Sequence, residues 1–220
     1  MTLFDHDERR RRIGEVVVDV IARDGLDAAT VRRIAAEVGF STTVITHCFS
    51  DKRDLLLSAY HILGEIARVR FEKCFSRDSS DLVSYLMSMS AVDAADLAYW
   101  RTFIAIWDRS LRDADFASEV RSWIEEGVMR VQVFIRVLNP GCMDTARIAR
   151  RLISLVQGIS VQLLFDSESW SEDAVRDAIA SEVELLVGKQ HRSEASVRSA
   201  SRVFHYEASS RNRSFLLTER

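Results

Sequence analysis

The 220-residue chain contains only one proline and eight glycines. All-β folds use such turn residues far more often, so this scarcity predicts an all-α protein. Apolar residues make up 47% and charged residues 29%, which is ordinary for a folded globular chain. A chain of this length can bury a proper core in one large domain or two small ones.

The N-terminal segment carries the periodicity of short amphipathic helices. The first predicted helix covers about 7–23 and ends before Gly25. Its buried face is a stripe of aliphatic residues at helical spacing: Ile13, Val16, Val17, Val20 and Ile21. Thr30 is a suitable N-cap for a second short helix, which Gly39 ends.

A third short helix follows directly. Ser41 caps it, it covers about 42–48, and a long fourth helix then runs from Ser50 or Asp51 to about 75. Three short helices with a glycine turn between the second and third are typical of a helix-turn-helix. In that arrangement the third helix enters the DNA major groove, which is wide enough for one helix.

The third helix has a polar face suited to DNA. With Val44, Ile45 and Phe49 turned inward, the outward residues are Thr42, Thr43, Thr46 and His47. A threonine can hydrogen-bond a phosphate and can also touch a thymine methyl group. The alternative is a metal or nucleophile site at His47-Cys48. Neighbouring helix residues point about 100° apart and no other His or Cys stands at ligand spacing, which argues against that site.

The segment from Arg9 to Tyr60 resembles the DNA-binding domain of TetR-family transcriptional regulators. The resemblance lies in T-V-R-x-I-A at 30–35, V-G-x-S at 38–41, H-x-F at 47–49 and S-x-K-x-x-L at 50–55. Thr46 replaces the tyrosine common in the family's recognition helix, and Cys48 replaces another aromatic residue. Loss of that tyrosine removes a phosphate-contacting hydroxyl, so operator affinity or sequence choice is expected to differ.

The resemblance implies a set of DNA contacts around the third helix. Lys52 aligns with a family lysine that meets phosphate. The arginine run at 9–12 is either a solvated helix start or a set of phosphate or minor-groove contacts. The predicted DNA-binding residues are Arg9, Arg10, Arg12, Thr30, Arg32, Arg33, Thr42, Thr43, Thr46, His47 and Lys52. Thr30 also has a purely structural interpretation as a helix cap.

The second half of the chain predicts five more helices, over 81–92, 96–112, 115–138, 144–165 and 172–187. The helix over 144–165 has two apolar stripes, so one is expected to face its own core and the other another surface. The family resemblance implies a homodimer built from the last two helices. The predicted interface residues are Leu152, Leu155, Gly158, Ile159, Gln162, Val175, Ile179, Val183 and Leu186.

Aromatic residues gather in the same half. They are either ordinary core or, as the family implies, the lining of an effector cavity between helices. The predicted ligand-binding residues are Tyr99, Trp100, Phe103, Trp107, Trp123 and Phe134. Asp93, Asp96, Asp108 and Glu125 are candidates for a counter-charge to a cationic effector. The segment 155–171 also resembles the choline-betaine regulator subgroup, which does not fix the ligand.

Together these features predict a DNA-binding domain at 1–55, an effector-binding and dimerisation domain at 56–188, and a disordered, serine-rich basic tail at 189–220. No glycine-rich phosphate loop, metal cluster or Ser/His/Asp pattern is recognisable, so neither an enzyme nor a cofactor is expected. The scattered Cys48, Cys74 and Cys142 and the lack of a long apolar run predict a cytoplasmic protein without a membrane span.

The predicted function is a ligand-responsive repressor that binds double-stranded operator DNA as a homodimer and responds to a small-molecule effector. Residues 1–75 carry 12 basic and 12 acidic side chains, so this segment lacks the net positive charge common in DNA-binding domains. Its neutrality and the missing tyrosine leave open an alternative, a helical interaction module with a weakened DNA-binding head.

Overall fold

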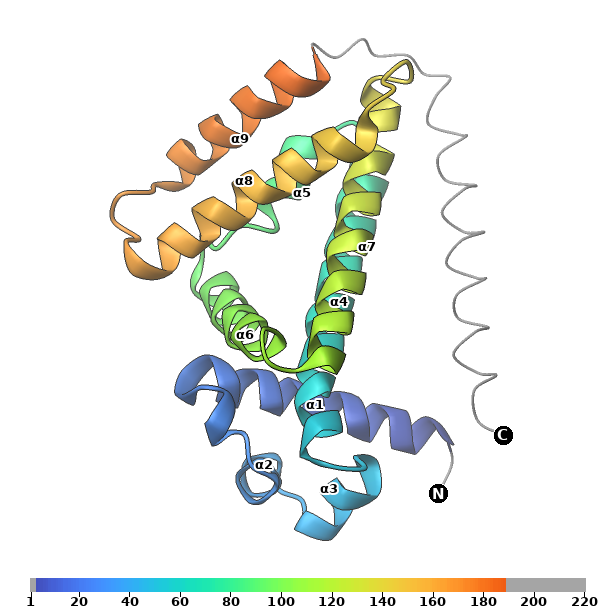
Figure 1. Cartoon of the computed structure of the whole chain (residues 1–220), viewed down its shortest axis with the longest axis vertical. Helices are drawn as coiled ribbons and strands as arrows, with labels where there is room; N and C mark the ends of the chain where they lie inside the picture. Colours follow the sequence, from blue (N-terminus) through green and yellow to red (C-terminus); the bar gives the residue numbers. More distant parts are fainter. Residues whose placement is uncertain (1–2, 189–220) are drawn as a thin grey trace.

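The computed structural model of the chain describes residues 3–188, and within that range the regular structure is entirely helical (Figure 1). The prediction of an all-α fold is confirmed. The elements are α1 (Leu3–Asp24), the short 3-10 helix η1 (Leu26–Ala28), α2 (Val31–Val38), α3 (Thr42–Cys48), α4 (Lys52–Arg77), α5 (Leu82–Met87), α6 (Ala94–Ser110), α7 (Ala114–Leu138), α8 (Thr145–Phe165) and α9 (Glu172–Val187).

The helices α1, α2 and α3 form the head at one end of the molecule. The local signals act as expected: the Thr30 side chain caps α2 by accepting from the Arg33 amide, and Ser41 caps α3 by accepting from the Val44 amide. Gly39 ends α2 in the left-handed region at φ 77°, a conformation that costs glycine little. These residues set where α2 begins and ends and where α3 begins.

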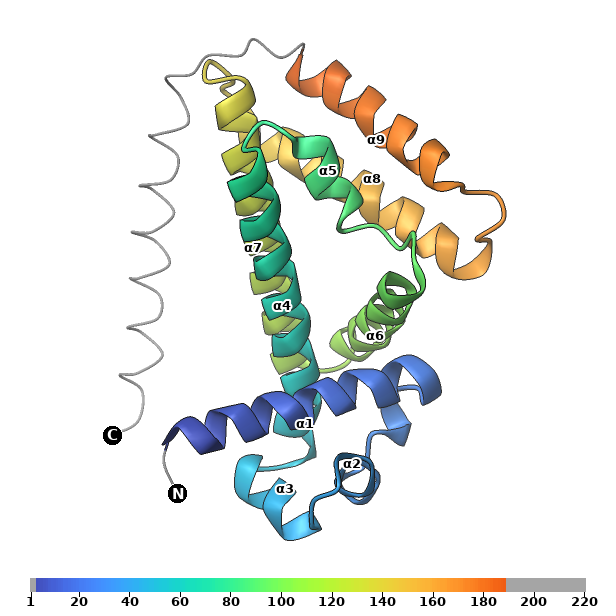
Figure 2. The same ribbon diagram turned by 180° about the vertical axis from the view of Figure 1, so that it is seen from behind.

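The remaining helices form the body. In both views α4 and α7 lie side by side and α1 crosses their lower end, while α6, α8 and α5 complete a triangular frame with α9 outside α8 (Figures 1 and 2). The joint between head and body is made by α1, which packs on α4 and on α6. A single helix, α4, runs unbroken across the predicted boundary at residues 55 and 56.

The predicted helix over 81–92 is wrong in length, because α5 ends at Met87. Tertiary hydrogen bonds take the backbone groups that a longer helix would use. Arg70 donates to the Ser88 carbonyl, the Trp100 indole donates to the Met89 carbonyl at 2.9 Å, and the Ala91 amide donates to the Ser160 hydroxyl at 3.2 Å. The predictions for 189–220 lie outside the described residues.

In the described part of the chain one helix, α8, is long and apolar enough to cross a membrane by length and composition alone. Core helices of soluble proteins pass the same test. Here the buried side of α8 packs against α6, α7 and α9, and three arginines (Arg147, Arg150, Arg151) lie on its exposed side. Those contacts and charges fit a core helix.

Candidate DNA-binding head and effector site

The outer face of α3 is polar and open to solvent. Ile45 and Cys48 are buried beneath it, while Thr42, Thr43, Thr46 and His47 are all exposed. The Thr46 hydroxyl donates to the Thr43 carbonyl at 3.1 Å, so its hydrogen is used inside the helix and its oxygen remains an acceptor. The predicted outward face of the third helix is therefore present in the structure.

Cys48 is not an activated nucleophile. Its thiol is buried, and burial raises its pKa despite the nearby charges of Arg9 and Arg10. A raised pKa keeps the sulfur protonated and unreactive. No group of three or more His, Cys, Asp or Glu side chains within residues 3–188 could hold a metal ion.

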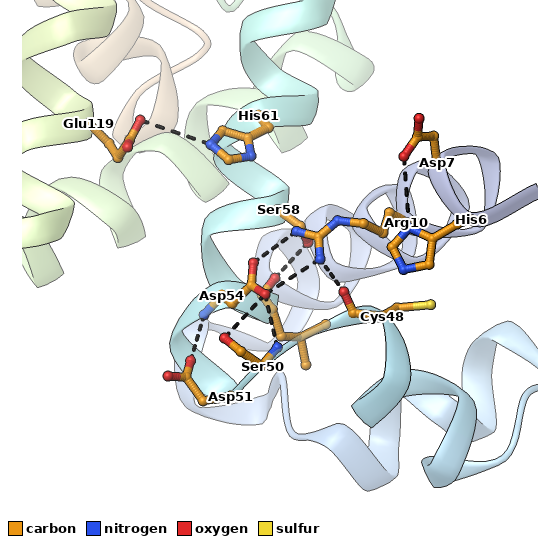
Figure 3. Close-up of polar contacts among 11 residues, drawn as sticks. His6, Asp7, Arg10, Cys48, Ser50, Asp51, Asp54, Ser58, His61 and Glu119 are labelled. Atoms are coloured by element: carbon orange, nitrogen blue, oxygen red, sulfur yellow. Dashed lines mark hydrogen bonds and ion pairs between the residues drawn. The ribbon is translucent and has the colours of Figure 1, made fainter. Parts of the chain in front are cut away.

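Arg10 anchors α3 instead of facing DNA (Figure 3). Its guanidinium donates to the Cys48 carbonyl at the end of α3 and to Asp54 at 2.8 Å, and it lies over the Phe49 ring at 4.3 Å. Asp54 in turn accepts from the Ser50 amide at 2.9 Å. These contacts join α1, α3 and α4, so the prediction that Arg10 contacts DNA does not fit the structure.

Asp54 is the counter-charge of this anchor. Partial burial raises its pKa, but hydrogen bonds from Arg10 and Ser50 outweigh that effect and hold the pKa below its ordinary value. The carboxylate is therefore ionised at neutral pH, which is the form that binds the guanidinium.

Arg33 is also committed to the fold. It donates to Asp24 at 2.6 Å and to Glu37 at 3.0 Å, and Arg23 donates to the same two carboxylates. This four-residue network ties the end of α1 to α2. All four side chains have solvent access, so the network fixes geometry more than it adds stability.

Other predicted cations are available to a phosphate. Arg12, Arg32 and Lys52 are exposed, and none of them forms an ion pair with a described residue. Arg12 lies 5.5 Å from the centroid of the Phe40 ring, which holds its stem against the head. Arg9 is half-buried near Cys48. Thr30, whose hydroxyl caps α2, is itself exposed.

The joint between head and body carries polar links. The Thr102 hydroxyl on α6 donates to the Val18 carbonyl of α1 at 3.1 Å, and Arg53 in the first turn of α4 reaches Asp113 at 3.2 Å. On α4, His61 faces Glu119 of α7 at 3.9 Å (Figure 3). A groove of about 410 Å³ opens between α1 and α4, and His61 is one of its lining residues. The head is thereby connected to α4, α6 and the start of α7.

The predicted aromatic residues fall into two places. Phe103 of α6 is fully buried and lies 4.7 Å from Trp107 and 4.3 Å from Trp123 of α7, measured between ring centroids. Around it also lie Tyr99, Trp100 and a residue that the sequence analysis did not identify, Tyr60 of α4. Phe134 packs instead against Phe71, Phe75 and Tyr85. We call Tyr60, Tyr99, Trp100, Phe103, Trp107 and Trp123 the aromatic cluster.

Polar atoms in the aromatic cluster lack partners. The Tyr60 hydroxyl and the indole N–H groups of Trp107 and Trp123 are buried without a hydrogen bond to any described residue. The Trp100 indole, in contrast, is bonded to Met89. Buried donors without partners are uncommon in folded proteins, so each calls for an explanation such as a bound water, an ion or a functional role.

The candidate counter-charges are already paired or solvated. Asp96 is bonded to Arg70, Asp108 to Arg112 at 2.6 Å, and Asp93 caps α6. Burial raises the pKa of Asp96, although the Arg70 charge opposes that shift. Glu125 is exposed. None of the four stands as a free buried carboxylate in the described structure.

The predicted interface residues divide by burial. Leu152, Ile159, Val175, Ile179 and Val183 lie inside the protomer, so they belong to its own core and the prediction is wrong for them in this conformation. Leu155 and Leu186 are half-buried, and Gly158 and Gln162 are exposed. Two large apolar side chains join this outer surface, Phe165 with 83% of its area exposed and Leu185 with 73%.

A helix-turn-helix with an open polar face, carried on a helical body, defines a DNA-binding transcriptional regulator. A model of the bacterial regulatory proteins of the tetR family matches residues 15–59, and a model of the C-terminal domain of BetI-type transcriptional repressors matches residues 80–188. The chain belongs to the TetR family of transcriptional regulators and carries a BetI-type C-terminal domain.

Individual proteins agree with this assignment. The HTH-type transcriptional regulator PksA of Bacillus subtilis is 24% identical over 188 residues, which is 83% of this chain and 92% of that protein. The nicotine-responsive transcriptional repressor HdnoR of Paenarthrobacter nicotinovorans is 26% identical over 165 residues, 72% of this chain and 85% of that protein. A transcriptional regulator of Saccharomonospora viridis, solved in complex with choline, has the same fold at a TM-score of 0.70 and 24% identity, covering 81% and 96% of the two chains.

Proposed function

We propose that the protein is a cytoplasmic, homodimeric repressor that binds a palindromic operator and is released from it by a small-molecule effector. The observation that carries the DNA-binding part is the face of α3, whose four polar side chains are exposed, while Arg12, Arg32 and Lys52 form no ion pair with any residue in 3–188. The neutral net charge of the segment does not oppose this, because charge placement matters more: Asp24, Glu37 and Asp54 are paired with other arginines and not with Arg12, Arg32 or Lys52.

The test of DNA binding is the salt dependence of affinity for a random-sequence duplex, measured by fluorescence anisotropy. Each phosphate contact contributes a slope of about −0.9 to the logarithm of affinity against that of salt. In a dimer, Arg32→Ala or Lys52→Ala removes two contacts and should reduce the slope by about two. Arg68→Ala is the control, since Arg68 is exposed on α4 and paired with Glu72 at 2.8 Å. If the wild-type protein shows no binding at low salt and no salt dependence of affinity, the proposal is refuted.

A second copy is proposed to pack on the outer surface of α8 and α9. The support is the set of apolar and small residues along this surface, with Gly158, Phe165 and Leu185 exposed and Leu155 half-buried. Sedimentation equilibrium should show a dimer, and Leu185→Glu together with Phe165→Glu should convert it to a monomer. Val69→Glu is the control, because Val69 is an exposed apolar residue of α4, 52% exposed, away from this surface.

The effector is proposed to bind in the body at the aromatic cluster, where α4, α6 and α7 meet. Both α4 and α6 also contact α1, so a change in their spacing reaches the head through the Thr102–Val18 and Arg53–Asp113 bonds. An effector that prefers a conformer with misplaced heads lowers DNA affinity by linkage. Relatives that respond to nicotine or bind choline support a small-molecule effector.

A further inference from the structure

The aromatic cluster presents hydrogen-bond donors rather than charges, and this property restricts what it can hold. Only 3% of Tyr60 is exposed, and its hydroxyl has no hydrogen-bond partner among the described residues. Burial, reinforced by the charges of Tyr99, Glu119 and Glu126, raises the pKa of Tyr60, so the hydroxyl keeps its proton at neutral pH. The Trp107 and Trp123 indoles can only donate. Three donors of the aromatic cluster, one each from α4, α6 and α7, thus have no acceptor within the described part of the chain.

The rings of the aromatic cluster pack against one another around Phe103. Phe103 lies nearly parallel to Tyr60 at 6.1 Å and to Tyr99 at 6.0 Å, and Trp107 and Trp123 lie at tilted angles within 4.7 Å of its centroid. A quaternary ammonium ion binds to ring faces, and it is helped by a free carboxylate. The carboxylates whose charge acts on Tyr60 face other groups, Glu126 pairing with Arg130 at 2.8 Å and Glu119 facing His61.

We propose that the effector of this protein is an uncharged molecule able to accept at least two hydrogen bonds, such as an aryl ketone, whose carbonyl oxygen has two lone pairs, held by Tyr60, Trp107 and Trp123. This inference rests on the proposed effector site in the body. Trp107 and Trp123 are only partly buried, so both side chains can be reached from solvent. Acceptor atoms of the ligand satisfy donors that are otherwise left unbonded, which favours this class over cations and over plain hydrocarbons.

The test is calorimetric titration of the full-length protein with three naphthalenes of similar shape: 2-acetylnaphthalene, 2-isopropenylnaphthalene and the trimethyl(2-naphthyl)ammonium ion. The ketone is expected to bind at least tenfold more tightly than the other two. Ketone binding no tighter than that of the hydrocarbon, or tighter binding of the ammonium ion, overturns the proposal.

Protein variants test the donors themselves. Tyr60→Phe removes only a hydroxyl, so it should weaken the ketone at least fivefold, leave the hydrocarbon unchanged, and leave the Tm of the free protein equal or higher. Tyr85→Phe is the matched control, since Tyr85 is equally buried but packs with Phe71 and Phe134. A fall in Tm on Tyr60→Phe, or equal ketone affinity in both variants, contradicts the assignment.

Release of DNA is measured separately with the same ketone by anisotropy. If the ketone binds through these donors but does not release DNA, the proposed ligand class holds and the proposed effector mechanism is refuted. If the ammonium ion releases DNA and the ketone does not, the proposed effector mechanism holds and the proposed ligand class is refuted.

Discussion

Gly158 provides a test of the proposed dimer in which stability and association change in opposite directions. It lies mid-way along α8 on the exposed side, and a Cβ built on it would meet nothing within 4 Å. Gly158→Ala therefore gains about 1 kcal/mol of helix propensity without a clash in the protomer. For a chain of this size, that corresponds to a rise of roughly 2–4 °C in Tm.

The same methyl group intrudes if a second copy packs closely on α8. Overpacking of a well-packed surface costs about 1–3 kcal/mol. Because about 1.4 kcal/mol is a factor of ten in an equilibrium constant, the dimer dissociation constant should rise about fivefold or more. Sedimentation equilibrium measures that constant, and thermal unfolding at several protein concentrations separates it from protomer stability.

Gly127→Ala is the matched control for this experiment. Gly127 is also mid-helix, but it is buried and faces inward, where a Cβ would make an ordinary contact with Ile153 at 3.7 Å. It should raise Tm without changing the dissociation constant. If Gly158→Ala likewise stabilises the protein and leaves the dissociation constant as in the wild type, Gly158 does not lie in a close interface and the reasoning fails.

Three further predictions concern the head and its joint. Arg10→Met should destabilise the protein by about 1–2 kcal/mol, allowing for partial exposure, because Asp54 and the Cys48 carbonyl lose a charged donor. Arg12→Met should leave the Tm unchanged and reduce only the salt slope of DNA binding. The pKa of Asp54 is lowered in the folded state, so its contribution to stability is present above its unfolded pKa of about 4 and is lost as the pH falls further. The Tm of Asp54→Asn should therefore fall less below pH ~4 than the Tm of the wild type. The same fall of Tm in both proteins would contradict this. Gly14→Ala should lower the Tm by a few degrees, because its Cβ would lie 2.9 Å from the Ile62 side chain where α1 crosses α4. A raised Tm would show that the two helices can accept the added methyl group.

The sequence predicts the local features of the head well because they depend on neighbours in the chain. Thr30, Gly39 and Ser41 act through bonds within four residues or through their own backbone angles, so their roles are legible without tertiary information. The outward face of α3 follows from the same short-range periodicity. The bounds of α2, α3 and α8 agree with prediction to within about a residue for that reason.

Roles that depend on distant partners could not be predicted. Arg10 and Arg12 are the same residue type two positions apart, and on a helix they point about 200° from each other. Only the placement of Asp54 and the α3 carbonyl shows that one is an anchor and the other is available. Likewise, the stripes of α8 show two apolar faces but not which of them the protomer itself covers. The sequence therefore predicts the wrong surface for Leu152 and Ile159.

Tyr60 is the clearest omission from the predicted site. It lies in the first half of α4, in a segment that the sequence assigns to the end of the DNA-binding resemblance, and no local pattern marks it. Its importance arises because α4, α6 and α7 converge on Phe103. A search for polar aromatic residues on every helix of the body would have included it.

The most direct test of the account is DNA binding by a single-residue variant of α3. Thr43→Glu places a negative charge on the exposed face that is assigned to the major groove, whereas Ser76→Glu places the same charge on an exposed site near the far end of α4. Anisotropy on a duplex selected by the protein should show affinity lost at least a hundredfold for the first and kept within twofold for the second. Equal affinity of both variants and the wild type would contradict the claim that α3 reads DNA.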